Sequence, residues 1–568
     1  MRELLRDVRY GVRMAWRAPA WSAVAIGSLA LGIGANTAVF TLLNALFLRP
    51  LPLRAPAELV EVFTQRDTAP GHLPVSFPNY EDFRDHTAAW SSLAAFMPVS
   101  VSVSTARAPV PLQLDAAIVT GNFFDTLGVL PGRGRLLRPQ EDKPPGAHPV
   151  VVLSDGLWHR RFAADPGIVG QAIEIDGQGF TVVGVAAPGF SGLSVLNATE
   201  LWVPVAMHQQ ILPSAIRRYF PLRRPLMFSL VGRLRPGIGL SRAEAEMRAL
   251  AAELARRYPD ANEGRTVSLL PLTRTTIGPD DRSTYLKAGA VLMAVVALVL
   301  LVACANVANL LLARAAGRRR EMALRLALGA RRAQLLRQLF AESLVLALAA
   351  GVLGLLFALW TRRVFVTFDS PYLPAALDLG LDGRVLAFSL AVSLGAALLF
   401  GLVPAAHSAR VDLTAMLKDA PAAAGVKLGR FGLHDLLIVV QMALSLVCVI
   451  GTALFLLSLR NAGRIDPGFE RENLLVLSFD LDGRSYQEAA ARPWLRRVVE
   501  RVAALPGVRS AAVAASVNLD PNQMRILRTT VIEGRGTAPE DHPTVHVNIV
   551  GPGYFATLGI PIQRGRGF

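Results

Sequence analysis

The chain has 568 residues, of which 52% are hydrophobic and only 18% are charged. Ordinary soluble domains carry about 25% charged residues, so the composition excludes a disordered chain and indicates that part of the protein faces lipid. Two cysteines, Cys304 and Cys448, are too few for a disulfide framework or a zinc site. The formal net charge of +16 leaves nucleic-acid binding open until the basic residues are located.

The N-terminal segment, residues 1–20, has the pattern of an amphipathic helix. Leu5, Val8, Val12 and Trp16 follow one face, and five arginines follow the other. Such a helix lies in the plane of the membrane interface. Contact with another protein remains the alternative.

Five uncharged stretches are long enough to cross a bilayer, which takes about 20 apolar residues. They cover residues 18–48, 288–313, 343–361, 385–406 and 436–459. The first is too long for a cleaved signal peptide. The sequence therefore predicts a multi-pass α-helical membrane protein.

Lysine and arginine gather before the first span, between the second and third spans, and between the fourth and fifth. These segments share one side if every span crosses once, and the positive-inside rule places that side, with the N-terminus, in the cytoplasm. Topology thus explains the positive charge, and no nucleic-acid partner is expected.

Two segments, 49–286 and 460–568, then lie outside the cytoplasm. The first has strand-like runs at 150–153, 172–175 and 180–185, with a turn at Asp176-Gly177 before the last. A helix from Ser241 to Tyr258 is predicted, capped by Ser241 with Glu244 in a capping box. We expect a large mixed α/β extracytoplasmic domain.

An internal repeat links the two outer segments. Residues 118–135 read IVTGNFFDTLGVLPGRGR, and residues 549–566 read IVGPGYFATLGIPIQRGR. Strand-like segments at 58–63 and 473–478 follow spans one and five. We interpret the chain as a duplicated membrane protein that is truncated within its second repeat.

A basic helical stretch, residues 306–342, leaves the second span and returns to the membrane. It suits docking to another protein, and the alternative is a loop that anchors to anionic lipid. Within it, RRREMALRLALGA followed by AES resembles the coupling region of MacB/FtsX-like ABC transporter permeases. LLRDVRYGVRMAWRAPAW, GIGANTAVF and GNFFDTLGVLPGRGR resemble, more specifically, the duplicated acidobacterial-type permeases.

The resemblance implies a domain order along the chain and a bacterial inner-membrane location. The expected domains are a cytoplasmic helix (1–20), a first span (21–48), a MacB-like core (49–286), an FtsX-like permease domain (287–410), a linker (411–433), a fifth span (434–459) and an incomplete second outer domain (460–568). The permease domain would hold spans at 288–313, 340–361 and 385–406 and a coupling helix at 314–337.

Site residues are expected in two places. The resemblance implies that the coupling helix contacts an ATPase subunit through Arg320, Glu321, Arg325, Gly329 and Ala330. Small and polar residues in the spans predict helix packing, and these are Gly34, Asn36, Asn306 and Asn309.

Catalytic motifs are missing from the sequence, which has no phosphate loop, zinc motif or nucleophile elbow. We expect no enzyme activity, no metal and no cofactor, with ATP bound by a separate ABC-type ATPase. A homodimer or pseudodimer and a periplasmic adaptor are further partners to be tested. The expected function is efflux or extrusion driven by mechanical motion. The alternatives are FtsX-like signalling to a periplasmic cell-wall hydrolase and, in another class, a membrane-anchored enzyme.

The topology can be tested by cysteine labelling. In a chain whose two native cysteines are replaced by alanine, Arg320→Cys should react only with a membrane-permeant reagent and Arg160→Cys also with an impermeant one, because only the second lies outside the cytoplasm. The reverse pattern would overturn the orientation.

Overall fold

The computed structural model describes residues 2–49, 51–66, 69–105, 108–317, 332–367, 380, 382–402, 433–464, 466–470, 472–477, 488–515, 526–529 and 544–567. The chain forms two compact units, which we call the membrane unit and the sheet unit. The membrane unit comprises Met1–Pro50, Ser194–Ala198 and Thr276–Ala462. The sheet unit comprises Leu51–Leu193, Thr199–Thr275 and Gly463–Phe568.

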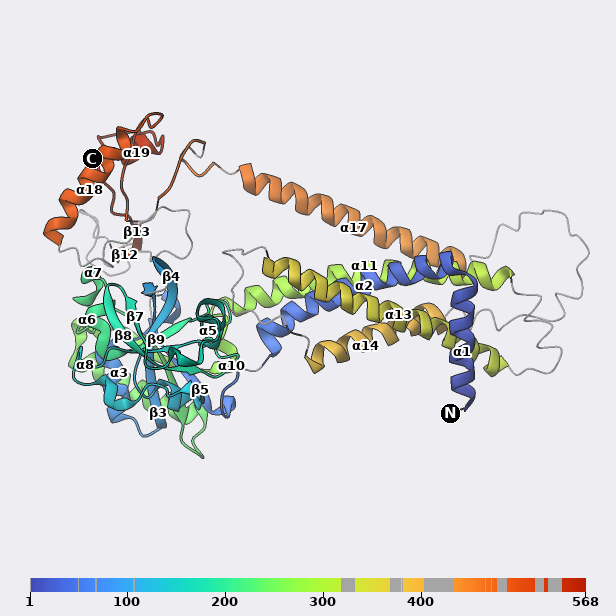
Figure 1. Cartoon of the computed structure of the whole chain (residues 1–568), viewed down its shortest axis with the longest axis horizontal. Helices are drawn as coiled ribbons and strands as arrows, with labels where there is room; N and C mark the ends of the chain where they lie inside the picture. Colours follow the sequence, from blue (N-terminus) through green and yellow to red (C-terminus); the bar gives the residue numbers. More distant parts are fainter. Residues whose placement is uncertain are drawn as a thin grey trace, which may run out of the picture. The chain divides into compact units, whose positions relative to one another are not determined.

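The membrane unit is mostly helical in its described part (Figure 1). Its elements are α1 (Arg2–Arg17), α2 (Pro19–Leu43), the π-helical η1 (Asn44–Leu48), α11 (Arg282–Gly317), α13 (Arg332–Thr367), α14 (Gly383–Ala397), the π-helical η6 (Leu398–Leu402) and α17 (Leu433–Arg464). Helix α2 packs against α11, α13 and α14.

Within the described residues, four helices are long and apolar enough to cross a membrane. They cover Pro19–Leu48, Arg282–Arg314, Leu336–Thr361 and Ile438–Arg464. The predicted multi-pass fold is confirmed. The predicted span at 385–406 corresponds to the shorter α14 and its continuation η6, and residues 403–406 lie outside the described part.

A single residue separates α1 from the first span. Ala18 is non-helical, with φ −134° and ψ 70°, because the ring of Pro19 disfavours a helical conformation in the residue before it. Pro19 can start α2 without the loss of a hydrogen bond, since the first N–H of a helix has no acceptor within the helix. In Figure 1, α1 runs across the direction of the bundle helices.

The sheet unit is built on an 11-stranded mixed sheet in its described residues. Its strands are β1 (Leu59–Arg66), β2 (Ala69–Leu73), β3 (Trp90–Thr105), β4 (Ala108–Val119), β5 (Pro131–Gly134), β6 (Val150–Leu153), β7 (Ala172–Ile175), β8 (Gln178–Ala186), β9 (Leu201–Pro204), β10 (Ser229–Leu234) and β11 (Arg265–Pro271). The order is β11-β1-β10-β3-β4-β9-β6-β8-β5, with β2 on β1 and β7 on β3 and β8. Among these described strands, only the β4–β9 and β6–β8 pairs are parallel.

Short helices accompany the sheet and its connections. They are α3 (Phe77–His86), α4 (Phe123–Leu127), α5 (Asp155–Phe162), α6 (His208–Ile211), α7 (Ser214–Arg217), α8 (Leu240–Arg257), α9 (Pro259–Asn262) and α10 (Leu272–Thr275), with 3-10 turns at Pro56–Glu58, Pro139–Asp142, Pro166–Ile168 and Val205–Met207. The C-terminal part holds α18 (Glu488–Ala503), β12 (Ile526–Thr529), β13 (Thr544–Val547) and α19 (Tyr554–Thr557).

The sheet is buried on both faces. On β9, Leu201 and Val203 belong to the hydrophobic core that includes residues of α3 and α8, whereas Trp202 faces a second core that includes α4. Successive side chains of a strand point to opposite faces, so one short strand supplies both cores. The predicted mixed α/β domain is confirmed.

Two local predictions have different outcomes. The turn at Asp176-Gly177 joins β7 to β8 with φ of +48° and +77°, the pair of positive values that a tight type I′ hairpin requires. The predicted cap at Ser241 is wrong, because α8 begins at Leu240 with Gly239 as its N-cap and without a side-chain cap. Glu244 instead pairs with Arg248 one turn on, at 2.6 Å.

The local geometry of the sequence repeat occurs in both copies. A left-handed glycine follows both α4 and α19: Gly128, with φ +67°, comes directly after α4, and Gly559, with φ +66°, comes after Leu558, the C-cap residue of α19. The N–H of the next residue donates to a phenylalanine carbonyl oxygen of the helix, at 3.0 Å in the first copy and 2.8 Å in the second. This pattern is a Schellman-type cap, which favours glycine.

In both copies, the chain that follows the span donates a backbone hydrogen bond to the leucine that precedes the left-handed glycine. The N–H of Arg54 donates to the carbonyl oxygen of Leu127 at 3.2 Å, and that of Glu470 donates to Leu558 at 2.8 Å. The segment 473–478, expected to be a strand, forms no strand in its described residues 473–477. The duplicated, truncated character of the chain stays a prediction.

A buried carboxyl group lies on β1, the strand next to the edge strand β11. Glu61 of β1 is only 8% exposed, between β10 and β11. Burial raises the pKa of Glu61 from 4.5 to about 7, against the opposing effect of a hydrogen bond with Thr275.

This carboxyl group should make the sheet unit less stable as pH rises. Between about pH 4.5 and 7 the unfolded chain releases the proton of Glu61 while the folded chain retains it, so the free energy of unfolding falls across that window. Glu61→Gln should remove a decrease on the order of 1–3 kcal/mol. Urea unfolding of wild type and variant from pH 4.5 to 8 measures it. Glu253→Gln, at an exposed site of α8, is the control, and an unchanged slope in Glu61→Gln would contradict the assignment.

Candidate functional site

The helix interface of the membrane unit centres on two glycines. A Cβ atom on Gly354 of α13 would lie 2.9 Å from the backbone nitrogen of Gly34 and 3.1 Å from the carbonyl oxygen of Ala30. One on Gly34 would lie 3.0 Å from the carbonyl oxygen of Gly354. The backbones of α2 and α13 therefore meet at a point that only glycine allows, as is typical of membrane helices that pack through small residues.

Helix α2 also meets α11 closely. Asn36 is 3% exposed, and its Nδ2 donates to the carbonyl oxygens of Gly32, in its own helix, and Val296 of α11, both at 2.8 Å. A Cβ atom on Gly32 would lie 3.2 Å from Cα of Leu300. A shared amide and a close approach thus join the first two spans.

A second amide links α11 to α17. Asn309 Nδ2 donates to Oε1 of Gln441 at 2.8 Å, while its own Oδ1 is buried without a hydrogen bond to a described residue. Asn306 is half-buried one turn earlier on α11, and we find no side-chain hydrogen bond from it to the described residues. Among the four predicted packing residues, the structure thus connects Gly34, Asn36 and Asn309 to neighbouring helices by direct contact.

An ion pair that the sequence did not indicate joins α11 to α13. Arg314 Nη1 lies 3.3 Å from Oε1 of Glu342, and these side chains are 19% and 6% exposed. The guanidinium group of Arg314 also lies 4.6 Å from the ring centroid of Trp21 on α2. Three helices therefore converge on one buried charge pair.

In the predicted domain order, residue 314 is the first residue of the coupling helix, and residue 342 lies near the start of the span at 340–361. In the structure α11 continues to Gly317 and α13 already begins at Arg332, so both side chains lie inside long helices. The sequence does offer one signal for such a pair: a basic residue at the end of one span and an acidic residue near the start of the next.

The other end of the bundle is also held by polar contacts. Asn44 of η1 donates to Oδ2 of Asp382 at 2.8 Å, and this bond lowers the pKa of Asp382. Asp382 in turn caps α14 by accepting the N–H of Val385 at 2.9 Å. Arg384 donates to the carbonyl oxygen of Leu48. The π-helical end of the first span is thereby fixed to the start of α14.

The predicted coupling residues, Arg320, Glu321, Arg325, Gly329 and Ala330, lie outside the described residues, in the segment 318–331. The Arg314–Glu342 pair joins the two helices that lead into and out of this segment.

The glycine contact predicts a sharp difference between two substitutions. Gly354→Ala should lower the thermal stability of the purified protein in detergent by about 1–3 kcal/mol, because its Cβ meets backbone atoms that cannot move aside. The control is Gly27→Ala on α2, where nothing lies within 4 Å of the added methyl group and no loss is expected. Equal melting temperatures for the two variants would contradict the close approach of the helices.

Comparison with known families matches both parts of the chain. Residues 22–250 match the model of the MacB-like periplasmic core domain, and residues 293–413 match that of the FtsX-like permease C-terminal domain. The macrolide export ATP-binding/permease protein MacB of Burkholderia thailandensis is 26% identical over 307 residues, or 53% of this chain and 43% of that protein. MacB of Salmonella paratyphi A is 25% identical over 318 residues, or 55% and 45%. The chain therefore spans less than half the length of these relatives.

Solved structures that are similar include the periplasmic region of MacB from Actinobacillus actinomycetemcomitans, at 13% identity and a TM-score of 0.29, covering 41% of this chain and 94% of that one. A domain of a putative permease from Porphyromonas gingivalis has 13% identity and a TM-score of 0.30, covering 40% and 99%. The assignment rests on the two family models, which together cover most of both the first outer domain and the permease domain. The resemblance to MacB/FtsX-like permeases is confirmed: the chain contains a MacB-like periplasmic core domain and an FtsX-like permease C-terminal domain.

Proposed function

We propose that the chain is the transmembrane permease subunit of a MacB-like ABC transporter in a bacterial inner membrane, with its N-terminus in the cytoplasm. ATP hydrolysis in a separate subunit drives motion of the MacB-like domain, for efflux or extrusion of a substrate. The observation that carries this proposal is the buried Arg314–Glu342 pair, which joins the helices on either side of the predicted coupling segment.

The bundle contacts support a mechanical path. A force on the segment 318–331 acts on α11 and α13 together, because their ends are joined by the ion pair. Both helices hold α2, α11 through Asn36 and α13 through the Gly34–Gly354 contact. Helix α2 leads into the MacB-like domain after η1, and α11 leaves it, so a shift of these helices moves the points where the domain is attached.

The curated relatives are named as combined ATP-binding and permease proteins. This sequence contains no Gly-x4-Gly-Lys-Ser/Thr phosphate loop, which supports binding of ATP by a separate subunit and a non-enzymatic role for this chain. The sequence repeat and the two matching helix caps support a duplicated, pseudodimeric permease. A homodimer and a periplasmic adaptor are the remaining proposed assemblies.

The match of residues 293–413 to the FtsX-like permease model favours a second function, in which the same motion activates a periplasmic cell-wall hydrolase. Co-purification of a hydrolase, in place of export of a substrate, would select that function.

Two variants of the full chain, assayed with its ATPase subunit, test the coupling. Glu321→Ala/Arg325→Ala should lower co-purification of the ATPase at least tenfold, because it removes charges from the proposed docking surface. Glu342→Gln should leave association intact and lower stimulation of ATP hydrolysis, because it removes the charge pair that joins α11 to α13 and leaves the proposed docking residues in place.

Gly27→Ala serves as the control with both activities unchanged. Full association and stimulation in the Glu321/Arg325 variant would overturn the coupling role. Normal stimulation in Glu342→Gln would overturn the mechanical role of the ion pair.

A further inference from the structure

Four arginines gather at one end of the β1–β11 ladder in the sheet unit. Arg66 is the last residue of β1, and it stands directly opposite Arg265, the first residue of β11, in antiparallel register. Arg223 and Arg224 come from the chain before β10. The guanidinium group of Arg265 donates to their backbone carbonyl oxygens, at 3.1 Å to Arg223 and 2.8 Å to Arg224.

Negative charge balances only one of these arginines within the described part of the chain. Arg223 donates to Oδ2 of Asp82 at 2.5 Å and lies 4.0 Å from the ring centroid of Tyr258. No described carboxylate forms an ion pair with Arg66, Arg224 or Arg265.

The uncompensated positive charge affects the pKa of Arg265. Burial, followed by repulsion from Arg66 and Arg224, lowers the pKa of Arg265 to about 10. Like charges directly opposite each other in a ladder destabilise a sheet. The repulsion is therefore a cost in free energy that an additional negative group would relieve.

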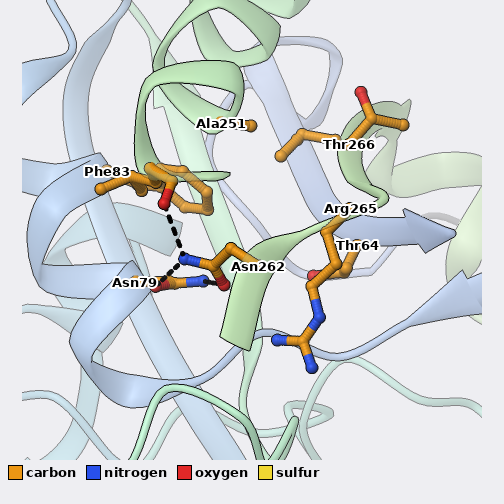
Figure 2. Close-up of a pocket in the computed structure, with 9 residues that line it drawn as sticks. Thr64, Asn79, Phe83, Ala251, Asn262, Arg265 and Thr266 are labelled. Carbon is orange, nitrogen blue, oxygen red and sulfur yellow. Dashed lines mark hydrogen bonds between the residues drawn. The ribbon is translucent and has the colours of Figure 1, made fainter. Parts of the chain in front are cut away.

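A shallow hollow opens beside Arg265. Figure 2 shows Phe83 and Ala251 on one side and the Arg265 guanidinium group pointing away from them. The polar side chains of Asn79 and Asn262 bond to each other, with Nδ2 of Asn79 donating to Oδ1 of Asn262 at 3.0 Å. Among the residues that line the hollow, only Arg265 carries a charge.

We propose that Arg66, Arg224 and Arg265 bind a phosphate-type oxyanion at the mouth of this hollow. Arg66 and Arg224 are exposed and can turn toward a ligand, while Arg265 is held in place by its two carbonyl acceptors. Guanidinium groups suit tetrahedral dianions, since they offer paired N–H donors and keep their charge when partly buried. The phosphate group belongs either to a soluble phosphate compound or to a phospholipid headgroup.

The test uses the full chain in detergent and follows its melting temperature. Inorganic phosphate should raise the melting temperature saturably, on the order of 2 °C, above a sodium chloride control of equal ionic strength. Dihexanoyl phosphatidylglycerol, kept below its micelle-forming concentration, is the second probe. A response to phosphate indicates a soluble ligand and a response to the lipid alone indicates a headgroup, and either supports the site.

The variant Arg66→Gln/Arg224→Gln should lose both responses and should melt at a higher temperature than wild type without added anion, because it removes the repulsion. The matched control is Arg161→Gln/Arg242→Gln, two exposed arginines of α5 and α8 that do not line the hollow. It carries the same loss of charge and should keep the wild-type response. No response to either probe in wild type, or an equal response in the Arg66/Arg224 variant, would overturn the proposal.

Discussion

The membrane unit depends on how closely two helices approach at Gly34 and Gly354. Lipid tails are as apolar as the side chains of the spans, so burial of apolar area gives little drive for helix association in a bilayer. What remains is close packing and hydrogen bonding, and both require backbones that nearly touch. On α2 itself, Asn36 donates to a carbonyl oxygen of α11, next to the close approach of Gly32 to Leu300. A single helix thereby organises its three neighbours.

The sequence indicated the kinds of residue at this interface but not their partners. The small-residue spacing around Gly34 and the polar Asn36 predict a packed face, because these features have a physical meaning in a lipid environment. Gly354 was not singled out, although it is the other half of the contact. Pairing of helices is a non-local property, and one sequence without homologues carries no information about which glycine meets which.

The sheet unit shows the same division between local and long-range information. The hairpin at Asp176-Gly177 could be predicted because the turn chemistry lies in two adjacent residues. The cap at Ser241 was predicted wrongly, because the helix starts two residues earlier, with Gly239 as its N-cap directly after the turn at Gly237. Similarly, Glu61 looks like a solvent-facing residue in an alternating strand. Its burial depends on long-range packing, because β1 pairs with β10 and β11 and the distant helix α10, which carries Thr275, packs against β1.

The break at Ala18 has a consequence for how the first span is anchored. A continuous helix would carry α1 along the axis of α2. The non-helical residue lets α1 turn across that axis and pack against α13, where a Cβ atom on Gly11 would lie 3.3 Å from Cα of Glu342. The two helices that meet at Ala18 therefore both rest on α13, and the bend fastens the start of the first span to the bundle.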